Sequence, residues 1–271
     1  MKKIITFMTL LFVLTLSSCN YGTDNLLYHA NSVSARTRTP AFKEVDFSST
    51  AQSLPDQYKV LVLTDTHIGN SSTIPPITEL YNYLDSMLTT DPNYPKFYIH
   101  LGDQTDHGYA SECTAYKEFT DKLESKYGLS TFNVVGNHDL YNSGWDNWVA
   151  SNKPGTSFYR FKTKTFSWYG IDTGSGTLGT DQYDTLKTLM YLDTNPKVVL
   201  MHYPLSYSNF VFCLQDTTER NNLISLFKVT SVKDVLCGHV HSTEALNHTS
   251  FTEYCFPSFT YQRTATILSV N

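Results

Sequence analysis

The chain has 271 residues, of which 41% are hydrophobic and 14% aromatic, so it can bury one sizeable core, and a single catalytic domain is the simplest organisation. Its formal net charge is −5 at neutral pH, and it becomes −7 when the two positive charges of Lys2 and Lys3 are left out. Because the rest of the chain has no dense cluster of lysine and arginine, electrostatic attraction to nucleic acid is disfavoured.

The first residues have the pattern of a secretory signal peptide. Lys2 and Lys3 precede an apolar run over residues 4–16, which is too short to cross a bilayer as a helix. Leu16-Ser17-Ser18-Cys19 follows and resembles the bacterial lipoprotein box, in which the cysteine becomes the lipidated first residue of the mature protein. We expect removal of residues 1–18 and acylation of Cys19, which would anchor the protein to a membrane of the bacterial cell envelope, outside the cytoplasm. An ordinary signal peptide cut nearby is the alternative.

Residues 19–55 are polar and uneven in composition, and we interpret them as a lipid-anchored tether ahead of a catalytic domain over residues 56–271. Four cysteines follow Cys19. In an oxidising compartment they permit two disulfides with three possible connectivities, which the sequence leaves open. These four are Cys113, Cys213, Cys237 and Cys255.

From residue 56 onward, apolar runs rich in β-branched residues alternate with helical patterns. The predicted strands cover residues 60–63, 97–101, 132–135, 198–200, 235–236, 251–256 and 265–270, with a hairpin over 157–162 and 165–171. The predicted helices cover residues 76–89, 111–126, 181–192 and 218–228, the second with Ser111 as its N-cap. The alternation, broken by a hairpin and ending in strands, favours two mixed sheets that face each other, with helices outside.

Polar segments follow five of these strands, at the end where open α/β sheets build their sites. In the last segment, histidines two apart would point to the same side of an extended backbone. Gly136 and Gly238 precede candidate ligands and would remove side-chain bulk where the backbone turns near them. The segments are Asp65-Thr66-His67, Gly102-Asp103-Gln104-Thr105-Asp106, Gly136-Asn137-His138-Asp139, Met201-His202 and Gly238-His239-Val240-His241.

Together, and in this order, the five segments resemble the signature of the calcineurin-like metallophosphoesterase family. The resemblance covers roughly residues 58–260 and implies a four-layer α/β/β/α sandwich. It also implies two divalent metal ions joined by Asp103 and a hydroxide, a pair suited to hydrolysing phosphate esters. By resemblance one metal would be held by Asp65, His67, Asp103 and His241, and the other by Asp103, Asn137, His202 and His239.

The same resemblance assigns roles beside the metals. His138 would face the substrate and stabilise charge or donate a proton to the leaving oxygen, and Asp106 would orient the His138 ring. Asp139 is interpreted as structural, bound to loop amides. The residues His107, Tyr109, Tyr141, Tyr203 and Tyr207 flank the motifs, where rim packing is a simpler interpretation than substrate contact.

Ligands of this kind without a thiolate favour Mn²⁺, Fe, Zn²⁺ or Ni²⁺ and leave the choice among them open. Asp106 stands where purple acid phosphatases have a tyrosine ligand, and Val135 stands where serine/threonine protein phosphatases have an arginine. Neither subgroup is therefore favoured. The main hypothesis is a membrane-tethered hydrolase of small phosphomonoesters or phosphodiesters, nucleotide-like compounds included. A metal-dependent nuclease and a non-catalytic binding lipoprotein are the alternatives, and the oligomeric state is open.

Overall fold

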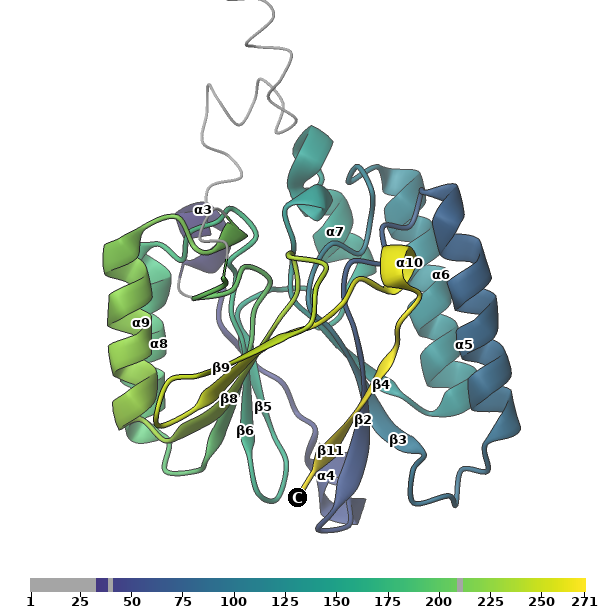
Figure 1. Ribbon diagram of the computed structural model, residues 1–271, viewed down its shortest axis with the longest axis horizontal. Coiled ribbons are helices and arrows are strands. Elements are labelled where there is room, and N and C mark those ends of the chain that lie inside the picture. Colours follow the sequence, from purple (N-terminus) through teal and green to yellow (C-terminus); the bar gives the residue numbers. More distant parts are fainter. Residues whose placement is uncertain (1–32, 39–40, 209–211) are drawn as a thin grey trace, which may run out of the picture.

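The structure, a computed structural model, describes residues 33–38, 41–208 and 212–271 (Figure 1). Two mixed β-sheets face each other and helices cover their outer faces, which confirms the predicted four-layer α/β/β/α sandwich. The expected signal peptide and Cys19 lie outside the described residues. Within the described ranges, no helix combines the length and the apolar character needed to cross a bilayer.

The larger sheet, sheet A, has the strand order β1-β5-β6-β7-β8-β10-β9, and sheet B has the order β11-β2-β3-β4. Strands β6, β7 and β8 are parallel in sheet A, as are β2, β3 and β4 in sheet B, while β5 and β6 form the predicted antiparallel hairpin. The strands of sheet A are β1 (Lys43–Glu44), β5 (Tyr159–Lys162), β6 (Ser167–Gly170), β7 (Lys197–Leu200), β8 (Val232–Cys237), β9 (Glu244–Asn247) and β10 (Thr252–Cys255); those of sheet B are β2 (Tyr58–Leu63), β3 (Pro95–His100), β4 (Ser130–Asn133) and β11 (Thr266–Val270).

Helices α8 (Thr180–Leu192) and α9 (Thr217–Val229) cover sheet A, and α5 (Ile74–Ser86) and α6 (Ala110–Tyr127) cover sheet B (Figure 1). The predicted N-cap of α6 was wrong, because the helix begins after Tyr109 and the carboxylate of Glu112 accepts the Tyr109 amide at 3.3 Å. The short helices are α3 (Val33–Thr37), α4 (Ser48–Ser53), α7 (Trp145–Ser151) and α10 (Phe259–Gln262), with 3-10 turns η1 (Ser71–Thr73) and η2 (His138–Ser143).

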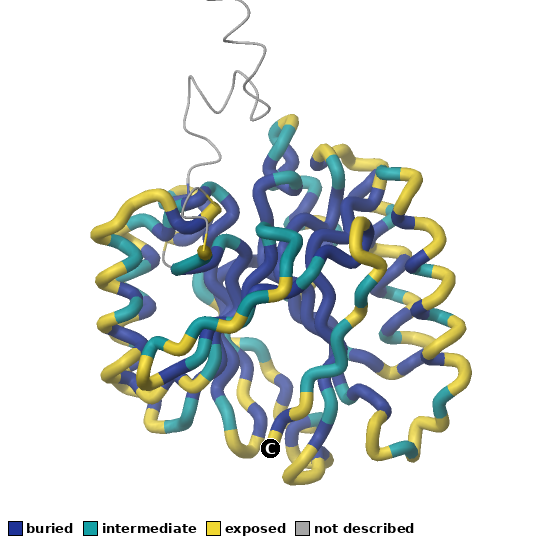
Figure 2. Tube along the Cα trace, viewed as in Figure 1, coloured by how far each residue is buried: buried dark blue, intermediate teal, exposed yellow. Residues whose placement is uncertain are grey.

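Aromatic rings fill the space between the two sheets. Phe132 of sheet B stacks on Phe161 of sheet A with ring centroids 3.7 Å apart, and Trp168 stacks on the same Phe161 at 5.7 Å. Phe97 meets Trp168 edge to face. Figure 2 shows the buried strands in dark blue, with exposed residues concentrated on the outer faces of the helices. This packing fixes the two sheets against each other and so places the loops at their ends.

Part of the segment expected to be a tether packs on the domain instead. Phe47, Ala51 and Leu54 are buried in the core between the sheets. Val33 and Arg36 of α3 are also buried. Apolar side chains spaced through an otherwise polar segment are enough for this docking. The packed domain therefore extends back to at least residue 33, rather than beginning at residue 56.

Replacing Phe132 with alanine should lower the free energy of unfolding by about 3–5 kcal/mol, because it removes a buried ring and leaves a cavity between the sheets. The matched control is Leu192→Ala, whose side chain is 78% exposed at the end of α8 and should cost under about 0.5 kcal/mol. Urea unfolding of both variants measures the difference. Equal losses in the two variants would contradict the assigned packing.

Candidate metal centre

The five motif segments meet at one edge of the sandwich, where strands of both sheets end. The Asp65 amide donates to the Gly102 carbonyl at 3.0 Å and joins the loops after β2 and β3. The Gly238 amide donates to the His202 carbonyl at 3.1 Å and joins the loops after β8 and β7. Between the sheets, the His239 amide donates to Oδ2 of Asp65 at 3.2 Å. The site is therefore built from both halves of the sandwich.

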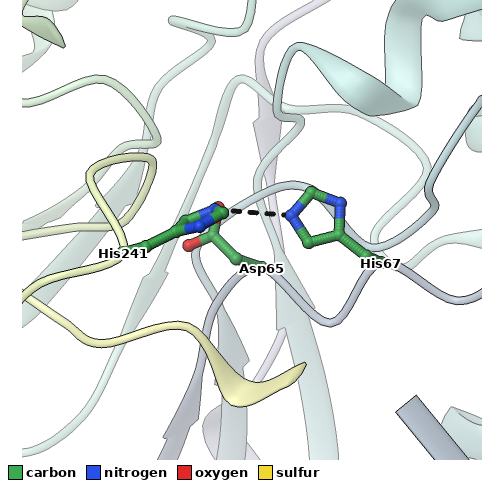
Figure 3. Close-up of side chains that lie close together, drawn as sticks. All are labelled: Asp65, His67 and His241. Atoms are coloured by element: carbon green, nitrogen blue, oxygen red, sulfur yellow. Dashed lines mark hydrogen bonds and ion pairs between the residues drawn. The ribbon is translucent and has the colours of Figure 1, made fainter. Parts of the chain in front are cut away.

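One group of candidate ligands contains Asp65, His67 and His241 (Figure 3). Nε2 of His241 lies 3.1 Å from Oδ1 of Asp65 and 3.4 Å from Nε2 of His67. Burial opposes the charge on Asp65, but the hydrogen bond with His241 and the nearby rings lower its pKa below the ordinary value. Two ring nitrogens and a carboxylate oxygen thus converge on one small volume, as ligands of a cation do.

A second group contains Asp103, His202 and His239, with Asn137 beside them. Nε2 of His202 lies 3.3 Å from Oδ2 of Asp103 and 3.1 Å from Oδ1 of Asn137. Oδ1 of Asp103 accepts the His138 amide at 2.8 Å. Burial of Asp103 opposes its charge, but His202 and the other histidines hold its pKa well below its usual range.

The contacts of His202 show that this second group fits a cation. Its Nδ1 donates to the Leu101 carbonyl at 2.8 Å, so Nε2 of the neutral ring carries a lone pair. That lone pair faces the oxygen acceptors of Asp103 and Asn137, an arrangement that requires either a proton or a metal ion between them. The structure brings together all seven predicted ligands, and their binding of two metals stays a prediction.

The expected contact between Asp106 and His138 has a different geometry. Nδ1 of His138 donates to the main-chain carbonyl of Asp106 at 2.8 Å, whereas the Asp106 carboxylate is 4.0 Å away. That carboxylate lies closer to Nδ1 of His67, at 3.4 Å, and the His67 contact contributes most to lowering the pKa of Asp106. Asp106 therefore holds the His138 ring through its backbone, and its side chain orients the ligand His67.

Asp139 has the structural role expected for it. It is fully buried, and its two oxygens accept the amides of Asp103, Thr105 and Gly136 and the Thr105 hydroxyl at 2.9–3.0 Å. Burial and the charge of Asp103 raise the pKa of Asp139 to about 7. A cation beside Asp103 would offset that charge and favour the ionised form of Asp139, which accepts all four hydrogen bonds.

The close approach predicted for two glycines is confirmed. A Cβ atom on Gly136 would lie 2.2 Å from the Asp103 amide nitrogen, and one on Gly238 would lie 1.9 Å from Oγ1 of Thr64. A side chain on Gly136 would push its loop away from the loop that carries Asp103, and one on Gly238 would push its loop away from the loop that carries Thr64 and Asp65.

The extended backbone predicted for the last motif was wrong. His239 and His241 have φ angles of 67° and 51°, so a left-handed conformation at each residue, rather than strand alternation, sets the directions of their rings. Left-handed backbone is unfavourable for residues with a Cβ and persists where surrounding contacts impose it. Three more predicted ligands share this conformation: Asp65, His67 and Asp103.

Sequence reasoning missed three residues that support or border the site. His100, which had been given no role, accepts the Gly102 amide at 3.2 Å and contacts the Thr66 hydroxyl at 3.1 Å, so it links two ligand loops. Oγ1 of Thr173 accepts the amides of His202 and Tyr203 at 3.0 Å. The only signal for His100 was a polar residue in an apolar strand, and Thr173 lay in no motif.

Aromatic rings border the candidate ligands. Tyr203 stacks on His239 with centroids 3.8 Å apart, and Tyr141 lies 4.6 Å from His138. Tyr261 of α10, the third missed residue, lies 5.2 Å from the His241 ring and is 50% exposed. Of the other flanking residues, Tyr109 stacks on His107, and Tyr207 packs against the apolar core between sheet A and helices α8 and α9.

Comparison with known proteins agrees with this site. Residues 58–243 match the calcineurin-like phosphoesterase family. No curated protein matches the chain. Among solved structures, a dimetal phosphatase from Danio rerio is similar with a TM-score of 0.58 and 9% identity, over 75% of this chain and 88% of that one. GAP50, described as the anchor in the inner membrane complex of Plasmodium, is similar with a TM-score of 0.57 and 15% identity, over 75% of this chain and 72% of that one.

A purple acid phosphatase from seeds of yellow lupin, Lupinus luteus, is similar with a TM-score of 0.55 and 14% identity, over 74% of this chain. The match covers only 44% of the lupin enzyme. At these identities the similar structures establish the fold alone. Because the family match spans more than half of the chain, the protein belongs to the calcineurin-like phosphoesterase family. It is a phosphoric ester hydrolase of a family that uses divalent metals.

The charge on His202 should make the stability of the metal-free protein depend on pH. Burial opposes that charge, but Asp103 raises the pKa of His202 from 6.5 to about 9. A group whose pKa is higher in the folded than in the unfolded protein stabilises the folded state. The full contribution is present at pH values below the pKa of the unfolded protein, and it is lost as the pH rises through the pKa of the folded protein. We expect the free energy of unfolding to fall by on the order of 1–3 kcal/mol between about pH 7 and pH 9.

Urea unfolding across this pH range, on protein stripped with a chelator, measures the effect. Protein loaded with metal should show a weaker dependence, because the metal replaces the proton on His202. A stability of the stripped protein that stays constant or rises from pH 7 to pH 9 would contradict the assigned contact with Asp103.

Proposed function

We propose that the protein is an extracytoplasmic, membrane-tethered phosphoesterase that uses two divalent metals to hydrolyse phosphomonoesters or phosphodiesters of small, nucleotide-like molecules. The observation that carries the proposal is the convergence of Asp65, Asp103 and the histidines of both sheets on one volume, with Nε2 of His202 facing the oxygen acceptors of Asp103 and Asn137. The metals, when bound, would supply a nucleophile at neutral pH and neutralise charge on the phosphoryl group.

The chain's own residues would complete the reaction. His138 is held through Nδ1 by the Asp106 carbonyl, and its side chain is 31% exposed, so Nε2 is the ring atom left to meet the substrate. In the neutral ring Nε2 accepts a hydrogen bond, and in the imidazolium it can donate a proton to the leaving oxygen. Asn137 would be fixed by Oη of Tyr141, which its side-chain amide contacts at 3.1 Å.

The surroundings of the site favour a substrate with one phosphate group. In the described part of the chain, no lysine or arginine makes a hydrogen bond or ion pair with His138 or any of the seven predicted ligands. A second or third phosphate would therefore find no lysine or arginine already bound to these ligands. The neighbouring rings of Tyr141, Tyr203 and Tyr261 suit an apolar or planar leaving group.

Attachment through Cys19 is supported by the lipoprotein-like sequence that precedes it. Fourteen positions separate Cys19 from Val33, the first residue that the structure describes. Even a fully extended segment of this length reaches only about 50 Å, so an anchor at Cys19 would keep the domain near the membrane surface.

Hydrolysis of p-nitrophenyl phosphate and bis-p-nitrophenyl phosphate tests the catalytic proposal. The chain from residue 20 onward, stripped of metal and then given Mn²⁺, should hydrolyse at least one of the two. Asp103→Asn should lower kcat by at least about a thousandfold, because it removes the carboxylate charge that lies among His202, His239 and His67 and that is proposed to join the two metals. The ratio of the two rates separates monoesterase from diesterase. Absence of metal-dependent turnover on both compounds and on nucleoside monophosphates would refute the proposal.

Membrane attachment is tested separately, by expressing the whole chain in a bacterium that has the lipoprotein pathway. The native chain should sediment with membranes and incorporate labelled fatty acid, whereas Cys19→Ser should do neither, because it lacks the thiol that is acylated. Cys213→Ser, a buried thiol within the domain, is the control and should behave as the native chain. Equal labelling of native protein and Cys19→Ser would contradict the anchor.

A further inference from the structure

A buried ion pair fastens the N-terminal helix α3 to sheet A. Nε of Arg36 donates to Oδ2 of Asp172 at 2.8 Å, and an Nη atom donates to Oδ1 at 3.0 Å. The guanidinium also donates to the Ser175 hydroxyl at 2.9 Å, and both charged side chains are fully buried. This bidentate pairing with a carboxylate requires the planar guanidinium group of arginine, and the ammonium group of lysine cannot reproduce it.

Asp172 begins the loop after β6 that supports the second group of candidate ligands. Oδ1 of Asp172 accepts the Gly174 amide at 3.1 Å and so shapes the turn around Thr173. Oγ1 of Thr173 accepts the amides of His202 and Tyr203. The ion pair is therefore separated from the backbone of a predicted ligand by a single residue.

The Arg36 guanidinium also lies over the ring of Trp145 in α7, with Cζ 5.4 Å from the ring centroid. Trp145 stacks on Trp148 at 5.3 Å, and the indole of Trp148 donates to the side chain of Gln104 at 2.9 Å. Gln104 directly follows Asp103 in the loop after β3 of sheet B. Arg36 thus contacts supports of ligand loops from both sheets.

We propose that Arg36 is a positioning residue of the metal centre, acting on His202 through Asp172 and Thr173 and on the Asp103 loop through Trp145 and Trp148. The inference rests on the metal centre of the proposed function. It gives a site role to a segment that precedes every metal-binding motif in the chain. Loss of Arg36 would leave the Asp172 carboxylate buried without its cation. The loop after β6, which binds the His202 amide through Thr173, would then rearrange to bring that carboxylate into contact with water.

Cobalt binding tests this role without relying on turnover. The chain from residue 20 onward, stripped and titrated with Co²⁺, reports affinity and, through its visible absorption, the coordination geometry of the ion. Arg36→Ala should raise the Kd for Co²⁺ at least tenfold and alter the absorption bands. Arg36→Lys, which keeps the charge but loses the planar guanidinium group, should give an intermediate Kd.

The matched control is Arg160→Ala. Arg160 also pairs with a buried aspartate, Asp193, at 3.0 Å. Asp193 contacts Lys197 at the start of β7, whereas His202 follows the end of β7, so this ion pair lies at the opposite end of the strand from the ligand. Arg160→Ala should lower stability to urea while leaving Co²⁺ affinity and absorption unchanged. If Arg36→Ala does not fold, the charge-free pair Arg36→Met with Asp172→Asn replaces it. This pair leaves no unpaired buried charge, so it tests the lost contacts of the guanidinium with residue 172, Ser175 and Trp145, and it should also raise the Kd for Co²⁺ at least tenfold.

The outcomes are distinct. Native protein that binds no Co²⁺ would refute both the metal centre and the role of Arg36. Native protein that binds Co²⁺, with Arg36→Ala or the charge-free pair matching the affinity and absorption of Arg160→Ala, would refute the role of Arg36 alone. A tenfold loss in the Arg36 variants but not in Arg160→Ala would support it.

Discussion

The attraction between two buried carboxylates and the histidines that face them is the interaction on which the rest of the site depends. Asp65 and Asp103 are almost fully buried on loops of sheet B, and three of their ring partners, His202, His239 and His241, come from sheet A. Buried anionic charge is unfavourable unless a cation compensates it. The protonated ring of His202 provides that charge without metal, because its pKa is raised to about 9, and metal ions would provide it in the proposed enzyme. The same attraction draws the two sheets together at this edge.

The sequence was sufficient to predict the layers, the hairpin and the gathering of the ligands. Each of those features depends on a local pattern: an apolar run ends, and a polar motif such as Gly136-Asn137-His138-Asp139 follows at once. Parallel strands then bring the motifs to one edge, whatever the details of the loops. The expected role of Asp139 agreed with the structure because a buried carboxylate beside a turn accepts the main-chain amides around it, here one from its own loop and two from the loop after β3.

The remaining features depend on contacts between distant segments, which local patterns do not carry. Arg36 lies 136 positions before Asp172, and Tyr261 reaches the site from a helix without a motif. The left-handed backbone at His239 and His241 reflects how neighbouring loops crowd them, and the hydrogen bond from His138 to the Asp106 carbonyl reflects where one loop turns. None of these alters the composition or spacing of the motifs.

The aromatic layer between the sheets also acts as a spacer for chemistry at its edge. Because Asp103 belongs to one sheet and His202 to the other, the packing of Phe132 on Phe161 and of Phe97 on Trp168 across the sheets sets how far apart their loops are held. Divalent ions differ in radius and in the geometry they tolerate. Relatives with identical ligands can therefore differ in metal preference through substitutions deep in the core, where a comparison of active-site residues would not look.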